Sequence, residues 1–301
     1  MLPRRTPVGQ QRHRPPFRAG LTLLELLVAL SVMVMVVGTL GGLARAVQSG
    51  AAYSEGCADA TQHARVALER ITRSVDEAFA NQRFPGFIVV AEQEGRWRFP
   101  DTLVVWHPDP GVLAAYPGRP ALDDPNRLPY HDEVVVYCPD PDAPGRLVEI
   151  RSTRDVPLGA DPAAWPTEIQ VFKDSMSLDA AIFSSAGSRS PDYPAVTLTE
   201  RMRTGRSGDS GPAEPRGAVR FESLLRPSDE QWNDSSIAWE SLPWVQGMYG
   251  AKTAMRQAWL RVELQLLSGD TAGQSGSTGS QATAFFASAA VYYAMHRELR
   301  P

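Results

Sequence analysis

The feature that most constrains this chain is a long apolar run near its N-terminus, from Leu21 to Ala44. Glu25 is the only charged residue in the run. As a helix, these two dozen residues would rise about 36 Å, enough to cross a hydrocarbon core of about 30 Å. A carboxylate in such a segment is costly, and acids in membrane helices mark functional positions by default. The run therefore predicts a membrane segment in which the one acidic residue has a function.

The charges on either side of the run predict its orientation. The segment before it holds no acid and five arginines, namely Arg4, Arg5, Arg12, Arg14 and Arg18. By the positive-inside rule this leader stays in the cytoplasm. Beyond the run come Arg45, Glu55 and Asp59, which are polar enough to lie outside the membrane on the far side.

Gly20, Leu21 and Glu25 carry a resemblance to a known family. The run resembles the N-terminal cleavage and methylation segment of type IV prepilins and of the pseudopilins of type II secretion. In that family the leader is cut after a glycine, the new N-terminal residue is methylated, and the fifth mature residue is glutamate. Gly20, Leu21 and Glu25 occupy those positions here, with Leu21 where the family usually has phenylalanine. The resemblance covers about the first sixty residues and is specific only at residues 20–44.

The resemblance implies a structural filament subunit, not an enzyme, with no cofactor. Its expected partners are the prepilin peptidase and methyltransferase, other pilin or pseudopilin subunits, and the inner-membrane assembly platform. The expected location is the inner membrane, crossed once, with the head in the periplasm or outside and the helix incorporated into a filament. The length and the proline-rich loops look most like a minor subunit, of the J-type pseudopilin or PilW-like group. Glu25 argues against the filament-tip subunit, which usually lacks the glutamate.

Two alternatives remain open for the apolar run. Ala44-Arg45-Ala46 matches an A-x-A site for signal peptidase, which would remove everything before Val47. An ordinary signal has an apolar region of about 7–15 residues, however, and this run is longer. The other alternative is an uncleaved single-pass anchor that carries an extracytoplasmic binding module. Neither alternative explains an acid in the first helical turn.

After the run the helix is expected to continue. An apolar face recurs every three or four residues at Cys57, Ala60, Ala64, Leu68, Ile71 and Val75. Arg65, Glu69 and Arg73 lie four residues apart on the opposite side. The segment from Asn81 to Gly86, with Pro85, ends the helix. The expected divisions are a leader at 1–20, a membrane and filament-core helix at 21–44, a helix continuation at 45–80 and a β-rich head at 81–301.

From Phe87 onward an apolar period of two predicts strands. The candidates are Phe87–Val90, Thr102–Trp106, Glu133–Cys138, Arg146–Arg151, Glu168–Phe172, Ala195–Thr199, Ala218–Ser223, Trp259–Leu267 and Ala284–Tyr293. In Trp259–Leu267 apolar and polar residues alternate, which predicts an antiparallel strand with one wet face. The last two strands are expected to form a hairpin. The fold class is therefore α+β and pilin-like: a long N-terminal helix, membrane-spanning in its first half, packed on an antiparallel β-sheet head.

The two cysteines predict a disulfide between Cys57 and Cys138. Cys57 lies on the helix face expected to pack on the sheet, and Cys138 shares a strand face with Val134 and Val136. An oxidising envelope compartment would permit the bond. The alternative is two buried thiols that act as small hydrophobes.

Composition and motifs argue against other functions. Residues 21–301 carry 25 basic and 34 acidic residues, an acidic balance that disfavours nucleic acid as a partner. Gly208-Asp209-Ser210-Gly211 superficially resembles a protease serine segment, but Pro212 follows it, and no histidine lies in a recognisable motif. No phosphate-binding loop and no zinc-spaced cysteine pair occurs.

Two clusters could bind a ligand, and each has a plainer interpretation. Oxygen ligands are densest at Asp123, Asp124, His131, Asp132 and Glu133. Calcium takes six to eight oxygens, but the spacing matches no known loop, so we interpret this segment as a solvated acidic loop without metal. The aromatic group Trp232, Trp239, Trp244 and Tyr249 is interpreted as core or loop packing, with an exposed partner-binding patch as the alternative.

Overall fold

The computed structural model describes residues 22–94, 97–175, 192–205, 216–234, 236, 253–268 and 282–296. The chain divides into two compact units, residues 1–52 and 53–301. The dividing point lies within the long helix α1 (Leu23–Asp76), so the last part of that helix belongs to the second unit. A long apolar N-terminal helix with antiparallel sheets confirms the predicted α+β class.

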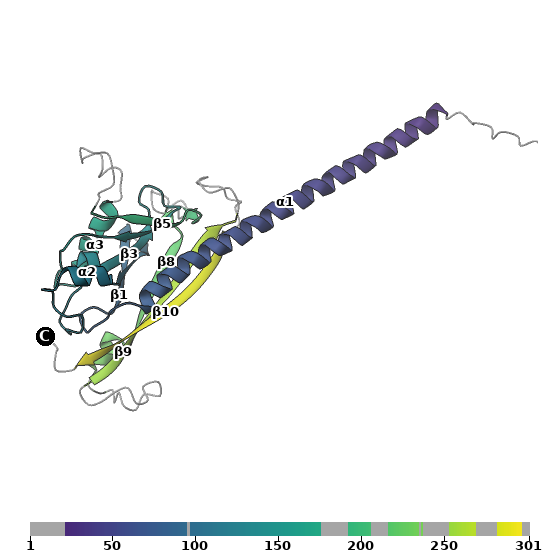
Figure 1. Cartoon of the computed structure of the whole chain (residues 1–301). Coiled ribbons are helices and arrows are strands. Elements are labelled where there is room, and N and C mark those ends of the chain that lie inside the picture. The colour runs from purple at the N-terminus through teal and green to yellow at the C-terminus, as the bar shows by residue number, and fades with distance from the viewer. Residues whose placement is uncertain are drawn as a thin grey trace, which may run out of the picture. The chain divides into compact units, whose positions relative to one another are not determined.

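The second unit contains two larger sheets (Figure 1). The first, here called the meander sheet, has the order β1-β2-β3-β4-β5 with every neighbouring pair antiparallel. The second, here called the terminal sheet, has the order β10-β9-β8 and is also antiparallel. The meander sheet consists of β1 (Phe87–Glu94), β2 (Trp97–Trp106), β3 (Val134–Pro139), β4 (Leu147–Arg151) and β5 (Ala195–Thr199). The terminal sheet consists of β8 (Val219–Arg226), β9 (Thr253–Leu267) and β10 (Ala282–His296).

Short elements connect these strands. A two-stranded ladder pairs β6 (Thr204–Gly205) with β7 (Arg216–Gly217). The short helices are α2 (Pro110–Ala115), the 3-10 helix η1 (His131–Glu133), α3 (Trp165–Asp174) and α5 (Asp229–Asn233).

The second half of α1 packs against both sheets and forms the main core. Ala60, Ala64 and Ala67 are buried on this face, together with Leu68, Ile71 and Val75. The small alanine side chains let the helix backbone approach the strands closely, and the larger ones fill the space near the helix end. Partners come from the meander sheet (Leu103, Val105, Val135, Tyr137) and from the terminal sheet (Leu260, Val262, Leu264, Ala289, Val291). The apolar face predicted from the sequence is confirmed, with Cys57 at its half-buried end.

A second core covers the opposite face of the meander sheet. Val104, Val136 and Ile150 point into it from the strands, and α3 closes it with Trp165, Ile169 and Phe172. The predicted strand at Glu168–Phe172 is therefore wrong, because this segment lies inside helix α3. Trp165, Ile169 and Phe172 recur at helical spacing, and Pro166 lies in the first turn, where proline is tolerated.

The terminal sheet has one buried and one wet face, as predicted. Leu260, Val262, Leu264 and Leu266 of β9 are fully buried, while the residues between them keep exposed surface. β9 and β10 pair along their whole length as the expected terminal hairpin.

The expected disulfide is absent, since Cys57 and Cys138 are both free. Cys138 is fully buried in the second core, alongside Val136 and Val148, whereas α1 packs on the other face of the meander sheet. The prediction placed Cys138 on the correct strand face with Val134 and Val136. It failed because the helix covers the opposite face.

Candidate functional site

The first part of α1 presents an apolar surface that nothing in the described chain covers. From Leu23 to Glu55 every side chain is exposed, with Leu24 at 72% and Met35 at 71%. Among the described residues, α1 is the one helix long and apolar enough to span a membrane. Burying this surface in lipid or against other helices would remove a large apolar area from water.

Glu25 lies at the start of this helix, where it closes a capping box with Thr22. The Thr22 backbone N–H donates to Glu25 Oε2 at 3.0 Å, and the Thr22 hydroxyl donates to the same oxygen at 3.0 Å. In return the Glu25 backbone N–H donates to Thr22 Oγ1 at 3.3 Å. Two backbone donors of the first turn are thereby satisfied. The sequence analysis overlooked Thr22, although Thr22-Leu23-Leu24-Glu25 has the Thr-x-x-Glu spacing of a capping box.

The other residues of the predicted processing site, Gly20 and Leu21, lie outside the described residues. Thr22 is the first residue described, and α1 begins at Leu23. Cleavage after Gly20 would therefore leave the Thr22–Glu25 cap on the mature chain.

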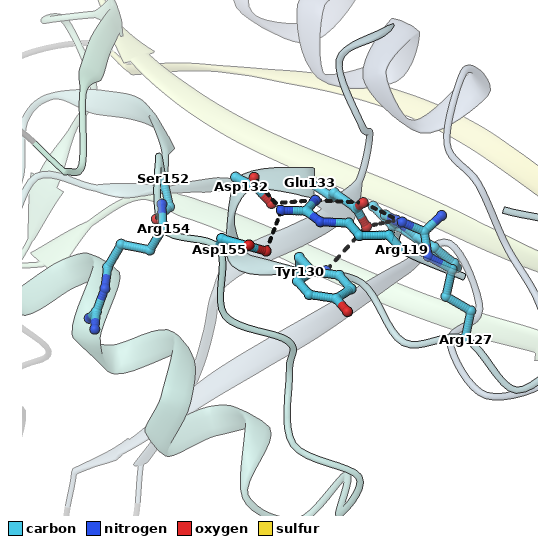
Figure 2. Close-up of polar contacts among 9 residues, drawn as sticks. Arg119, Arg127, Tyr130, Asp132, Glu133, Ser152, Arg154 and Asp155 are labelled. Atoms are coloured by element: carbon cyan, nitrogen blue, oxygen red, sulfur yellow. Dashed lines mark hydrogen bonds and ion pairs between the residues drawn. The ribbon is translucent and has the colours of Figure 1, made fainter. Parts of the chain in front are cut away.

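Of the acidic cluster predicted at residues 123–133, Asp132 and Glu133 form a buried ion-pair network (Figure 2). Asp123 is exposed, as the solvated-loop interpretation expected. Arg119 donates to Asp132 at 2.8 and 3.0 Å, to Glu133 at 3.0 Å and to Asp155 at 2.5 Å. Its side chain is 7% exposed. Asp132 and Glu133 are buried beside it. Among the described residues, no group of three or more histidine, cysteine or acidic side chains is placed to hold a metal ion.

Arg119 is also held between two rings. Its guanidinium carbon lies 4.1 Å from the ring centroid of Tyr116 and 4.1 Å from that of Tyr130. Burial alone would lower the pKa of Arg119, but hydrogen bonds to Asp132, Asp155 and Glu133 raise it above the ordinary value. Arg119 is therefore a fixed positive charge that anchors the loop.

Glu133 is the centre of the network and is fully buried. Besides Arg119, it accepts hydrogen bonds from Arg127, from Trp106 Nε1 at 3.3 Å and from the Tyr130 backbone N–H at 3.2 Å. Because these donors occupy its oxygens, the carboxylate is not free to coordinate a cation. β3 begins at the next residue, so the network fastens the loop before β3 to the meander sheet.

The three histidines whose side chains the structure describes give no catalytic constellation. His63 lies 3.7 Å from Asp59, His107 lies 3.2 Å from Glu77, and His131 packs on the ring of Phe172. Within the ranges that the structure covers, none of the three is hydrogen-bonded to a serine, threonine or cysteine. The segment Gly208–Gly211 lies outside the described residues.

Of the aromatic group, Trp232 is buried in the main core, as the core interpretation predicted. Trp239, Trp244 and Tyr249 lie outside the described residues, so the alternative of an exposed patch stays a hypothesis.

No family model, curated protein or solved structure matches this chain. The fold and the exposed helix therefore define a general class. The chain is an α+β protein, and among its described helices the N-terminal one is the candidate for a membrane-spanning segment.

Proposed function

We propose that this chain is a minor subunit of a type IV pilus or type II secretion filament, and that it assembles through its N-terminal helix. The observation that carries the proposal is an uncovered apolar stretch of α1, of membrane length and ending at Ala44, whose only acid, Glu25, lies in its first turn. The same helix then enters a head of antiparallel sheets, the arrangement expected of a pilin-like subunit.

In this proposal the leader is cut after Gly20 and the new N-terminus, Leu21, is methylated. The subunit waits in the inner membrane with its head in the periplasm or outside. The assembly platform then moves it into a filament whose core consists of packed N-terminal helices. The proposal assigns no bond-making step to the chain.

Glu25 would act during assembly. The α-amine of a neighbouring subunit, with a reference pKa of about 7.7–8.0, is largely protonated at neutral pH. In a water-poor filament core, the net free-energy gain from an acid–amine pair would be smaller than the attraction between the two charges, because both charges lose hydration. The pair would thus mainly set the axial register between helices.

The test has two parts. The N-terminal mass of the protein recovered from membranes should correspond to a methylated chain that begins at Leu21. Glu25→Leu should leave insertion and cleavage intact but prevent recovery of the subunit in sheared filaments, with Glu55→Leu, an exposed acid outside the apolar run, as the matched control. A mature N-terminus at Val47 would support the signal-peptide alternative. Wild-type recovery of Glu25→Leu in filaments would favour a tethered binding module.

A further inference from the structure

The outer edge of β10 (Ala282–His296) is open in the described part of the chain. β10 is the last strand in the order of the terminal sheet, and among the described residues it pairs only with β9. The pairing extends over all 15 residues of β10 without a shift of register. No other described strand lies along β10. The far side of this long strand is therefore available to a further strand.

β10 lacks the features that keep strand edges from pairing. Natural proteins protect edges with charged side chains, proline, β-bulges or short strands. Residues 282–296 contain no lysine, arginine, aspartate, glutamate or proline, and the ladder with β9 has no bulge. β1, an edge strand of the meander sheet, is different, because it carries Glu92 and Glu94 and its register shifts between Val90 and Glu92. The contrast indicates that the β10 edge is suited to pairing.

Backbone hydrogen bonds show which residues of β10 face outward. The Gln265 N–H donates to the Ala218 carbonyl, and the Gln265 carbonyl accepts from the Arg203 N–H, so both groups point toward the β8 side of β9. Backbone groups alternate in direction along an antiparallel strand, so those of Leu264 point toward its partner Phe285 on β10. The backbone groups of the alternate β10 residues therefore point outward: Ala284, Phe286, Ser288, Ala290, Tyr292 and Ala294.

The two faces beside this edge differ in exposure. The outward-facing residues have their side chains on the wet face of the terminal sheet, where Phe286 and Tyr292 are 57% and 53% exposed. Ser288, which lies between them along the strand, is small and exposed. On the other face Phe285 and Ala287 are half-buried and border the main core. An added strand would cover this apolar border with its own side chains.

These faces define the chemistry of a strand that fits. A side chain opposite Ser288 would stay in contact with water, whereas one opposite Ala287 would adjoin Phe285 and the main core. A charge in the second position would lose hydration and would find no charged partner on β10. The fitting strand therefore has polar side chains on the wet face and uncharged apolar side chains on the core face.

A second copy of this chain does not fit as the occupant. β10 shares the main core with the second half of α1, and this part of the helix runs along the strand (Figure 1). If two β10 edges paired antiparallel about a two-fold axis, the two α1 helices would enter their heads from opposite ends. One membrane could not then hold both apolar stretches. A parallel pair would instead join the wet face of one sheet to the core face of the other.

We propose that the outer edge of β10 binds an extended strand of a different protein chain by antiparallel strand addition, with polar and apolar side chains alternating along that strand. Its ladder bonds would go to outward-facing residues such as Phe286 and Ser288. Its polar side chains would lie beside these residues on the wet face, and its apolar side chains would cover Phe285 and Ala287. The proposed strand addition does not depend on the filament role, because it needs only the head and its anchor.

The test uses the full chain in detergent micelles and a labelled, alternating valine–threonine peptide of about eight residues, followed by fluorescence anisotropy. We expect saturable binding with valine on the core face. The outward-facing residues of β10 have wet-face side chains, so the threonine amides of the peptide should point toward β10 and the valine amides away from it. N-methylation of the threonine amides should therefore weaken binding at least tenfold, and N-methylation of the valine amides should not. Glutamate in place of valine should also weaken binding at least tenfold, because no apolar side chain then covers the core face.

Variants of the protein provide the second arm. Ser288→Pro removes one outward-facing N–H and no ladder bond to β9, and proline is tolerated on edge strands in this orientation. It should weaken peptide binding at least tenfold. Ser288→Val keeps the N–H and is the matched control, so it should bind the peptide like wild type. Circular dichroism would confirm that both variants are folded, and the two N-methylated peptides test the same ladder bonds on the unaltered protein.

Three peptide results would overturn the proposal: no saturable binding at millimolar peptide, equal affinity of the two N-methylated peptides, or equal weakening in Ser288→Pro and Ser288→Val. Sedimentation velocity of the full chain in micelles provides a fourth. Self-association that Ser288→Pro abolishes would overturn the assignment to a different chain, because the occupant of the edge would then be a second copy.

Discussion

Arg119 shows how a single side chain can organise a loop that the sequence suggests is solvated. It contacts three carboxylates and two tyrosine rings, and it is almost completely buried. Removing one partner of a buried ion pair leaves the other charge without compensation and costs about 3–5 kcal/mol. Arg119→Met should therefore lower the free energy of unfolding by about that amount, measured by urea denaturation.

The matched control is Arg83→Met, because Arg83 is an exposed arginine whose side chain lies outside this network. Its free energy of unfolding should change by no more than about 0.5 kcal/mol. Equal stability of the two variants would mean that Asp132 and Glu133 are solvated in the folded protein.

Cys138 provides a second residue-level prediction. It is fully buried, and burial raises the pKa of its thiol to about 12. Because the thiolate is the reactive form, Cys138 should resist alkylation in the folded protein, while the half-buried Cys57 reacts. Mass spectrometry after iodoacetamide treatment should find one modified cysteine in the native protein and two in the denatured, unreduced protein. A denatured protein with no reactive thiol would restore the disulfide hypothesis.

At the scale of elements, polar contacts supplement the apolar face that holds α1 on the meander sheet. Ser74 and Tyr137 share a buried hydrogen bond of 2.7 Å, and Arg70 forms a two-point contact with Glu149 of β4. Burial raises the pKa of Glu149, but hydrogen bonds from Arg70 and Arg151 outweigh that effect and lower it below the ordinary value. The ionised carboxylate thus stabilises the junction between helix and sheet.

This shift predicts a pH dependence. Because the pKa of Glu149 is lower in the folded state, its contribution is present above the unfolded-state pKa of about 4.3 and is lost as pH falls through the folded-state pKa. Glu149→Gln should be about 1–3 kcal/mol less stable at neutral pH and should lose less stability than wild type below pH ~4.3. Glu69→Gln, an exposed change on α1, is the control. Parallel stability–pH curves for wild type and Glu149→Gln would contradict the assignment.

The elements also show where sequence reasoning succeeds. The buried face of α1 and the alternation in β9 follow from local periodicity, because each needs only one flat partner surface. In α3, by contrast, Ile169 and Val171 alternate like a strand, while Trp165, Ile169 and Phe172 recur at helical spacing. Only the second core of the meander sheet explains why the helical pattern prevails. The capping box at Thr22 was readable from sequence and was overlooked.

At the scale of the whole molecule, the features that the sequence did not predict depend on contacts between residues far apart in the chain. The pairing of Arg119 with Asp155 joins loops far apart in the chain, and no local pattern marks it. The strand face of Cys138 was predictable, but the side of the sheet that α1 covers depends on how the strands and α1 pack together. Likewise, β1 and β2 lie next to β8, a strand more than a hundred residues later in the chain.

The main core joins the beginning of the head to its end, since Ala60 and Ile71 share it with Val291 and Met295. Synthesis proceeds from the N-terminus, so the helix emerges long before the strand that completes its burial. The head cannot close its core until β10 has been made, and until then the apolar faces that β10 covers stay open. A chain that ended before β10 would leave the buried faces of α1 and β9 exposed, and exposed apolar surface with an unpaired strand edge favours aggregation.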